Sequence, residues 1–251
     1  MSEVFKTQPI RPAATVILVR PAAQSFEIFM LRRTSKAAFA GGMYVFPGGR
    51  VDPEDHFNKY AAICTGPSES QQPQAKALGY DHLGYWVAGI RESFEEAGLL
   101  LAYDDAGNYL AFDSQEKAER FAAQREPMHR AELSLHELCE AEKLTLAVDR
   151  IHYYNRVVTP RGRPRRFDTR FFIAEAPVGQ VGLHDDTETV DSVWISPQEA
   201  LQKHDAGEFG LMRITQMQLT ELSAHASMEA LLEMAAMRQE FPVSRPKLPR
   251  N

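Results

Sequence analysis

The chain has few cysteines, no long apolar run and no excess of positive charge. Only two of its 251 residues are cysteine, Cys64 and Cys139. This is too few for a disulfide framework and is typical of a reducing compartment, so we interpret both as free thiols. The longest apolar runs, such as residues 16–19 and 99–102, are far too short to cross a bilayer. The formal net charge of −6 provides no overall basic field for nucleic acid. We therefore expect neither a membrane nor a nucleic-acid partner.

The two ends of the sequence carry no recognisable targeting signal. Residues 1–6 lack the basic and apolar regions of a signal peptide, and residues 247–251 do not match a Ser-Lys-Leu-type peroxisomal ending. We therefore expect a cytoplasmic protein. Hydrophobic residues make up 44% and charged residues 25% of the chain, as in an ordinary soluble globular protein. A length of 251 residues suits one large domain, or one domain with an appendage.

The most informative stretch is residues 91–99, Arg-Glu-Ser-Phe-Glu-Glu-Ala-Gly-Leu. If it is helical, with about 100° per residue, Glu92, Glu95 and Glu96 project from one face. An apolar stripe then projects from the other face: Leu83, Val87, Ile90, Phe94 and Ala97. Gly98 offers the left-handed residue that ends many helices. Like charges at this spacing repel. The carboxylates are therefore either a solvated acidic face or a site for a hard cation such as Mg²⁺ or Mn²⁺.

Strand patterns occur on both sides of this helix. β-branched or alternating segments predict strands at 12–20, 26–33, 44–46, 151–158, 169–174 and 190–195. The first two are expected to form a hairpin. Helices are predicted in two pieces within 113–143, after Ser196-Pro197, and over 214–239. This order indicates a mixed α/β domain. Residues 65–74 are polar and low in complexity, which predicts a mobile segment.

Residues 46–49, Phe-Pro-Gly-Gly, together with residues 91–99, resemble the signature of the Nudix hydrolases. Its usual form is G-x5-E-x7-R-E-U-x-E-E-x-G-U, where U is aliphatic. The second half is matched except that Ser93 occupies the first aliphatic position. In the first half, Asp55 stands where a glutamate is expected, with Glu54 beside it. A further 35 residues separate Asp55 from the second half, where the motif has seven. The sequence leaves open whether Glu54, Asp55 or neither supplies the first carboxylate.

A split signature of this kind resembles the Nudix branch typified by the mammalian peroxisomal coenzyme A diphosphatase. Flanking segments match as well: Leu-Arg-Arg at 31–33, Thr-Pro at 159–160 and Arg-Phe-Asp-Thr-Arg-Phe-Phe at 166–172. The resemblance spans residues 11–235 and implies an α/β/α sandwich around a mixed β-sheet. We expect one Nudix domain with these parts: the domain at 8–240, an insertion at 56–80, a C-terminal helical segment at 213–240 and a tail at 241–251.

The resemblance also implies roles for the charged residues. It makes Glu95 and Glu96 ligands of Mg²⁺ or Mn²⁺, and Glu92 either a ligand or a group that orients the attacking water. Arg91 would buttress these carboxylates through charge-assisted hydrogen bonds. Nudix enzymes draw the general base from different places. Glu188 is our candidate, with a solvated acidic loop as the alternative.

Substrate binding is assigned to the glycine loop and to arginines. Gly48 and Gly49 allow the backbone to approach a ligand closely, and Arg33 lies in the matched flank before them. Five arginines fall between residues 161 and 170, and guanidinium groups suit phosphate. Arg166 and Arg170 border the matched segment, so we assign them to a coenzyme A 3′-phosphate or another nucleotide phosphate. For Arg161 and Arg163, a solvated basic loop is equally compatible with the sequence.

The function implied is metal-dependent hydrolysis of a diphosphate linkage in a nucleoside diphosphate derivative, with coenzyme A or acyl-CoA as the leading substrate. ADP-ribose, NADH and nucleotide sugars are alternatives. The histidine motif of other coenzyme A-cleaving Nudix enzymes is absent, because residues 39–43 read Phe-Ala-Gly-Gly-Met. A weakly active Nudix-fold binding or regulatory module is a further alternative, motivated by Asp55 and the insertion. The expected partner is a small nucleotide-diphosphate substrate, and a homodimer is left open.

Overall fold

The structure is a computed structural model that describes residues 8–246 except 24 and 38. Its strands are β1 (Ile10–Pro21), β2 (Phe26–Arg33), β3 (Tyr44–Val45), β4 (Gly48–Arg50), β5 (Ala102–Tyr103), β6 (Thr145–Leu146), β7 (Ile151–Val158), β8 (Arg166–Glu175), β9 (Thr189–Ile195) and β10 (Val243–Ser244). Its α-helices are α1 (Gln72–Leu78), α2 (His82–Ala97), α3 (Gln115–His129), α4 (Leu135–Glu142), α5 (Pro197–Asp205), α6 (Arg213–Leu222) and α7 (Met228–Ala236). Its 3-10 helices are η2 (Pro53–His56), η3 (Asn58–Ile63), η4 (Glu69–Gln71) and η5 (Val148–Arg150).

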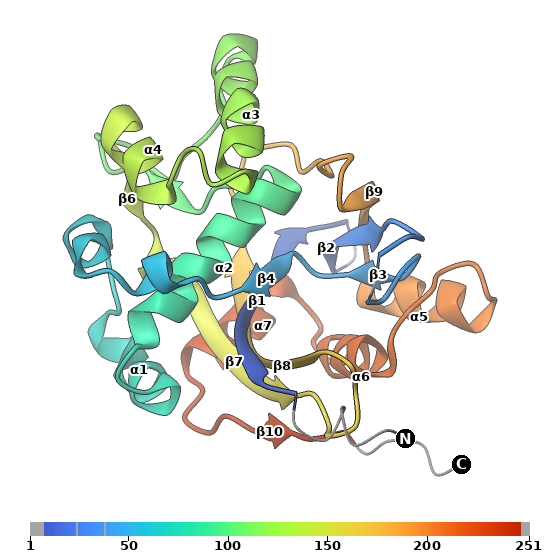
Figure 1. Ribbon diagram of the computed structural model, residues 1–251. Helices are drawn as coiled ribbons and strands as arrows, with labels where there is room; N and C mark the ends of the chain where they lie inside the picture. Colours follow the sequence, from blue (N-terminus) through green and yellow to red (C-terminus); the bar gives the residue numbers. More distant parts are fainter. Residues whose placement is uncertain (1–7, 24, 38, 247–251) are drawn as a thin grey trace.

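An eight-stranded sheet forms the centre of the molecule (Figure 1), in the order β10-β7-β8-β1-β2-β3, with β4 paired to β1 and β9 to β2. β1 runs parallel to β8 and antiparallel to β2, so the sheet is mixed, as predicted. The first half of β1 pairs with β4 instead of β2. This exchange of partners places the Gly48–Gly49 backbone directly beside β1, where α2 packs against both strands.

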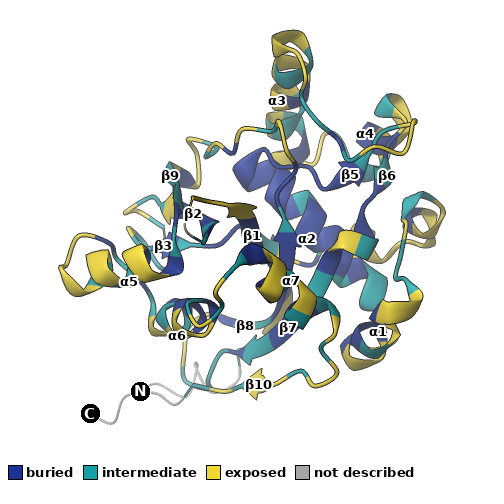
Figure 2. Ribbon diagram, turned by 180° about the vertical axis from the view of Figure 1, so that it is seen from behind, coloured by how far each residue is buried: buried dark blue, intermediate teal, exposed yellow. Residues whose placement is uncertain are grey.

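Helices cover both faces of this sheet, which confirms the α/β/α arrangement. β1 alternates between two apolar clusters because successive residues of a strand point to opposite faces. Val16 and Leu18 pack with the side that carries α2, whereas Ile17 and Val19 pack with the side that carries α6 and α7. Figure 1 shows α2 across the near face, and Figure 2 shows α7 over the opposite face. A strand covered on both sides explains the unbroken apolar run that marks β1 in the sequence.

α2 is the predicted acidic helix, and it is anchored through its apolar stripe. Val87, Ile90 and Phe94 are fully buried, and each stabilises the fold by about 1.5–3 kcal/mol. The helix ends at Gly98, whose φ of 69° lies in the left-handed region. The Gly98 amide donates to the Phe94 carbonyl at 2.9 Å and the Leu99 amide to the Ser93 carbonyl at 3.3 Å. This capping pattern fixes where the carboxylate-bearing turn stops.

The segment predicted to be mobile is instead folded, so that prediction is wrong. Residues 69–71 and 72–78 form η4 and α1, and two glutamines anchor them to the sheet. The Gln71 side-chain amide donates to the backbone carbonyls of Val148 and Ile151 at 2.8 and 2.9 Å. The Gln74 side-chain oxygen accepts from the Tyr153 backbone amide at 2.6 Å. Polar composition was misleading because these side chains satisfy buried backbone groups.

The predicted C-terminal helices are confirmed, and the segment after them adds a short strand. Two helices, α6 and α7, occupy the predicted helical segment. Of the predicted tail, Val243–Ser244 form β10 alongside β7, and Phe241 stacks on Tyr153 with ring centroids 4.7 Å apart. Residues 1–6 and 247–251, on which the expected compartment depended, lie outside the described part of the chain. None of the helices described combines the length and apolar character that a bilayer crossing requires.

Candidate functional site

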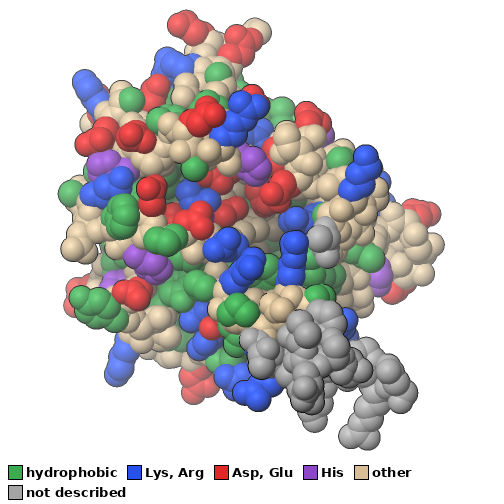
Figure 3. All heavy atoms as spheres, in the orientation of Figure 1, with side chains coloured by type: hydrophobic (Ala, Val, Ile, Leu, Met, Phe, Trp, Pro, Cys, Tyr) green, Lys and Arg blue, Asp and Glu red, His purple; other side chains and the backbone are tan. Residues whose placement is uncertain are grey.

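The acidic face of α2 forms one wall of a cavity of about 1090 Å³. β4, the end of α3 and the loop before α4 contribute other parts of its lining. Figure 3 shows Asp and Glu side chains gathered at the hollow in the centre of this face, with Lys and Arg side chains below them. Of the residues predicted for the site, the cavity brings together eight: Arg33, Gly48, Gly49, Arg91, Glu92, Glu95, Glu96 and Glu188.

Arg91 is the hub of the acidic wall. Its Nε and Nη2 atoms each donate to the Asp55 carboxylate at 3.0 Å, and its Nη2 donates to the Arg50 carbonyl at 2.8 Å. Its Nη1 lies 3.0 Å from Glu92 and 3.1 Å from Glu95. The Asp55 side chain is 1% exposed, whereas Glu54 is exposed. Asp55 therefore occupies the place of the first carboxylate that the sequence left open.

The glycine loop is fitted closely to two of the carboxylates. The Gly48 amide donates to Glu96 Oε2 at 2.9 Å. A Cβ atom on Gly49 would lie 2.5 Å from the carboxyl atoms of Glu92. Only a residue without a side chain leaves that position to the carboxyl group. The glycines thus contact the glutamates directly, a contact that the sequence did not predict.

Burial dominates the electrostatics of the three glutamates. It raises the pKa of Glu92 well above its ordinary value, against the opposing effect of Arg91. Burial likewise raises the pKa of Glu95, again opposed by Arg91. For Glu96, burial raises the pKa to about 8, while the Gly48 amide and Arg33 act to lower it. The cluster is therefore short of positive charge, since one guanidinium serves several buried carboxyl groups.

The chemistry of this cluster fits a hard divalent cation. All candidate donors are carboxylate oxygens, which Mg²⁺ and Mn²⁺ prefer, and a cation would favour the charged forms that burial disfavours. Across the described residues, no three His, Cys, Asp or Glu side chains converge on one point. Glu92 and Glu95 face Arg91, whereas Glu96 faces the Gly48 amide. The assignment of these glutamates as metal ligands stays a prediction.

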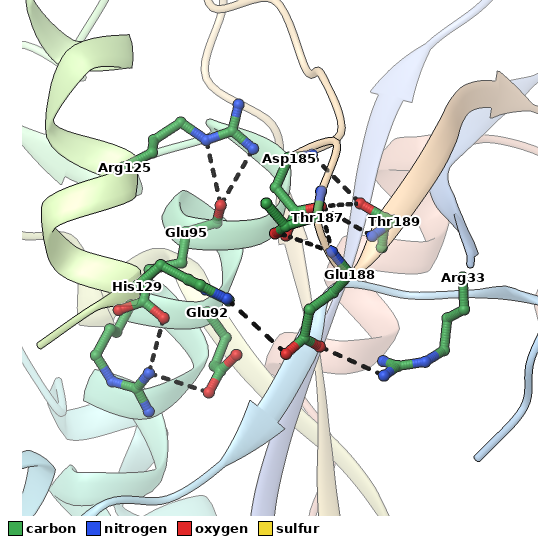
Figure 4. Close-up of polar contacts among 10 residues, drawn as sticks. Arg33, Glu92, Glu95, Arg125, His129, Asp185, Thr187, Glu188 and Thr189 are labelled. Atoms are coloured by element: carbon green, nitrogen blue, oxygen red, sulfur yellow. Dashed lines mark hydrogen bonds and ion pairs between the residues drawn. The ribbon is translucent and has the colours of Figure 1, made fainter. Parts of the chain in front are cut away.

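Glu188 reaches the cavity from the loop before β9 (Figure 4). β9 pairs with β2, which brings the loop beside Arg33 at the end of β2. Glu188 Oε2 lies 3.4 Å from Arg33 Nη2, and Oε1 lies 3.9 Å from His129 Nε2. Its side chain is 46% exposed. A half-exposed carboxylate between a guanidinium and an imidazole at the cavity wall is accessible to a substrate or a water molecule.

The two arginines predicted to bind phosphate do not line the cavity. Arg166 is buried and donates to the carbonyls of Thr159 at 3.2 Å and Gln8 at 3.4 Å. Arg170 pairs with Asp168 at 2.9 Å, and its guanidinium lies 4.3 Å from the Tyr85 ring centroid. Both guanidinium groups already have partners within the protein and lie outside the cavity lining, which speaks against the predicted role. Arg170 lies on the predicted strand, but β8 begins at Arg166, three residues earlier than predicted, and neither side chain lines the cavity.

Other basic residues take the place of these two at the cavity. Arg165, one position before β8, lines it, as do Arg11 at the start of β1 and Lys59 in η3. An aromatic pair lies at the same side: the ring centroids of Phe39 and Phe167 are 6.0 Å apart, and both residues line the cavity. The cavity therefore has an acidic wall on α2 and a basic, partly aromatic side near the ends of β1 and β8.

Two further residues of α3 contact the site and were not predicted from the sequence. His129 lies beside Glu188. Arg125 donates hydrogen bonds to the backbone at the end of α2 (Figure 4). Neither belongs to a recognisable motif, since α3 reads as an ordinary charged helix. Only the packing of α3 against α2 reveals them.

Comparison with known proteins shows what the whole chain is similar to. The family model described as the NUDT19 Nudix domain matches residues 10–223. The chain is similar to the acyl-coenzyme A diphosphatase NUDT19 of Homo sapiens, 26% identical over 254 residues that cover 90% of this chain and 66% of that protein. It is also similar to the putative nudix hydrolase 7 of Caenorhabditis elegans, 27% identical over 228 residues that cover 86% of this chain and 62% of that protein.

The chain spans about two thirds or less of the length of these relatives. Among solved structures, it is similar to a NUDIX hydrolase from Alicyclobacillus acidocaldarius, with a TM-score of 0.70 and 24% sequence identity. That match covers 90% of this chain and 97% of the other chain. At this identity the likeness establishes the fold.

Proposed function

This chain belongs to the NUDT19 Nudix domain family and is a Nudix hydrolase; from that premise we propose that it hydrolyses the diphosphate linkage of an acyl-coenzyme A or of coenzyme A. The proposal rests on one observation, that a single cavity has both an acidic wall and a basic side. Three buried glutamates of α2 face the hollow, and basic residues line the opposite side. A diphosphate flanked by a phosphorylated nucleoside needs both.

The carboxylates are proposed to act through a divalent cation. Nudix hydrolases generally use divalent metal ions, and Glu92, Glu95 and Glu96 would hold Mg²⁺ or Mn²⁺ here. When bound, the cation supplies charge stabilisation for the phosphoryl oxygens and lowers the pKa of water. Arg91 keeps Glu92 and Glu95 in place, because it is itself fixed by Asp55 and by the Arg50 carbonyl.

The remaining residues are proposed to position the substrate and to move a proton. Water attacks a phosphorus atom of the diphosphate, the bridging P–O bond breaks, and the leaving phosphate departs with the bridging oxygen. Glu188 is proposed to accept the proton of the attacking water, since its carboxylate is accessible and lies at the cavity wall. Arg33, next to Glu188, is proposed to bind a phosphate oxygen together with the backbone of Gly48 and Gly49.

Support for a coenzyme A substrate comes from the basic side of the cavity and from the human relative. That relative is named an acyl-coenzyme A diphosphatase. Coenzyme A carries a 3′-phosphate next to adenine, and Arg165 and Arg11 line the cavity close to the Phe39–Phe167 pair. Guanidinium groups bind phosphate, and aromatic rings stack with a nucleobase. We therefore propose that Arg165 and Arg11 bind this phosphate in place of Arg166 and Arg170.

A substrate panel tests the proposal. The purified protein is incubated with Mg²⁺ or Mn²⁺ and with acyl-CoA, coenzyme A, dephospho-coenzyme A, ADP-ribose, NADH and a nucleotide sugar. We expect release of 3′,5′-ADP from acyl-CoA or coenzyme A, with the highest kcat/KM of the panel. Release of AMP from ADP-ribose or NADH with a higher kcat/KM would overturn the substrate assignment in favour of those alternatives.

A weakly active binding or regulatory module is the second candidate. It is favoured only by the unusual signature, with Asp55 and the long detour before α2. Asp55 occupies the first carboxylate position and pairs with Arg91, so the substitution alone gives little reason to expect lost activity. A cytoplasmic location remains part of the proposal, and a homodimer stays open.

A further inference from the structure

The C-terminal turn of α2 is completed by a residue outside the Nudix signature. The last four carbonyl groups of a helix have no partner within it. In α2, the Glu95 carbonyl accepts from Arg125 Nε at 3.2 Å and from Nη2 at 3.1 Å, and the Glu96 carbonyl accepts from Nη2 at 2.9 Å. These carbonyls belong to two of the three proposed metal ligands. Arg125 therefore holds the backbone from which both side chains project.

The same guanidinium reaches the loop that carries Glu188. Arg125 Nη2 donates to the Leu183 carbonyl at 2.9 Å. The Leu183 amide donates to the Ala97 carbonyl, also at 2.9 Å. Leu183 is thus held on both of its peptide groups, once by the end of α2 and once by Arg125.

A compact turn transmits this attachment to Glu188. Asp185 Oδ1 accepts hydrogen bonds from the backbone amides of Thr187, Glu188 and Thr189 at 3.1, 3.1 and 2.8 Å. These hydrogen bonds hold the turn together from Asp185 to Thr189, and Leu183 lies only two residues before it. Glu188 is thus held from two sides: through this turn (Figure 4) from Leu183 and α2, and through β2, whose following residue Thr34 donates its amide to the Glu188 carbonyl at 3.0 Å.

The surroundings of Arg125 favour a backbone clamp over an ordinary ion pair. Among the ion pairs of the described residues, none involves Arg125, and its hydrogen bonds all go to carbonyl groups. A Cβ atom on Gly98 would lie 3.3 Å from Arg125 Nη1, so the glycine that ends the helix also leaves room for the guanidinium. A cation at a helix C-terminus is electrostatically favourable as well.

We infer that Arg125 is a positioning residue of the active site, which sets the separation between the Glu95–Glu96 turn of α2 and the loop bearing Glu188. The inference rests on the proposed function, in which the two parts must act on one diphosphate. It adds a residue of α3, outside the signature, to those on which turnover depends. A displacement of about 1 Å between reacting groups can lower a rate by about 100-fold.

Kinetics of Arg125→Met against a matched control test the inference. The control is Arg120→Met on the same helix; its guanidinium binds Glu142 at 3.0 and 2.9 Å at the surface. For Arg125→Met we expect kcat to fall at least about tenfold with KM within about threefold, because the basic substrate-binding side is untouched. For Arg120→Met we expect both values within about twofold of wild type. Arg125→Lys should recover little, since one ammonium group cannot span three carbonyls in the geometry of a guanidinium.

Hydrogen exchange separates positioning from general stability and needs no substrate. We expect faster exchange in Arg125→Met at amides 97–98 and 183–189, with exchange in β7 and β8 unchanged. If Arg125→Met does not fold, Arg125→Lys serves for both measurements. Retained kcat together with unchanged exchange at 183–189, or a uniform rise in exchange throughout the protein, would overturn the inference. If wild type cleaves no diphosphate, the proposed function fails, while the exchange data still decide whether Arg125 clamps the loop.

Discussion

Replacement of Asp55 by Asn is the perturbation whose cost follows most directly from the structure. Both Asp55 carboxylate oxygens accept from Arg91 at 3.0 Å, and the two side chains are 1% and 13% exposed. Asp55 Oδ2 also accepts from the Asp52 amide at 2.8 Å. Asn keeps the shape but removes the charge, and its amide NH₂ turns a donor toward a donor.

Removing one member of a buried ion pair costs about 3–5 kcal/mol. Asn retains one acceptor oxygen, and Arg91 keeps its contacts with Glu92 and Glu95. We therefore expect Asp55→Asn to lower the free energy of unfolding by about 2–4 kcal/mol. For a chain of this length, each kcal/mol shifts the melting temperature by about 2–4 °C. Glu54→Gln is the matched control, and as a change at an exposed neighbour it should cost less than about 0.5 kcal/mol.

Thermal unfolding followed by circular dichroism, with urea unfolding as a second measure, compares the two variants with wild type. Asp55→Asn should also lower kcat, because Arg91 would lose part of its anchorage and would hold Glu92 and Glu95 less precisely. Equal, small shifts for Asp55→Asn and Glu54→Gln would refute the reasoning. It would then be open again whether Glu54, Asp55 or neither supplies the first carboxylate of the signature.

Three more predictions concern other parts of the molecule. Gly49→Ala places a methyl group 2.5 Å from the Glu92 carboxyl atoms, so we expect Mn²⁺ affinity, measured by calorimetric titration, to fall at least about tenfold; unchanged affinity would contradict the role of this contact. Burial lowers the pKa of His152. The neutral imidazole therefore contributes fully to the free energy of unfolding above the unfolded-state pKa of about 6.5, and this contribution is lost as the pH falls through the lower pKa of the folded state. Melting temperatures of His152→Gln should accordingly decline less than wild type between about pH 7 and pH 5, and parallel declines would count against it. Arg165→Ala should raise KM for coenzyme A about tenfold relative to dephospho-coenzyme A, whereas Arg163→Ala, which alters an exposed arginine of the same loop, should not; equal effects would remove the assignment.

Local elements were predictable where local chemistry determines them. The apolar stripe of α2 and Gly98 predicted both the helix and its end. Ser196 and Pro197 marked the start of α5, where the Ser196 side chain accepts from the Glu199 amide. These features depend on neighbours within one or two turns, so the sequence contains the information needed.

Long-range pairings were not predictable in the same way. Nothing local indicates that the first half of β1 pairs with β4 and only its later part with β2, although this arrangement places Gly49 against Glu92. The arginines of β8 illustrate the same limit. Their number suggested phosphate binding, but the register of β8 turns Arg166 and Arg170 to Thr159 and Asp168 and leaves Arg165 at the cavity.

Residue 55 shows how the structure resolves an ambiguity in the motif. From the sequence, Glu54 has the expected chemistry and Asp55 the expected position. The turn of η2 buries Asp55 and exposes Glu54, so position prevails over side-chain length. Arg125 and His129 could not be predicted from the sequence at all, because they reach the site only through the packing of α3 against α2 and the Glu188 loop.

The central claim is that the carboxylates of α2 support metal-dependent cleavage of a coenzyme A diphosphate. Its most direct test is the release of 3′,5′-ADP from acyl-CoA by wild type and by Glu95→Gln, across a titration of Mg²⁺ or Mn²⁺. We predict release by wild type that rises with metal and is lost on chelation. Glu95→Gln should be at least about 100-fold slower while its stability stays within about 1 kcal/mol of wild type, since the lost Arg91 contact is offset by reduced repulsion among the glutamates. Release that ignores the metal, or that proceeds equally well in Glu95→Gln, would contradict the claim.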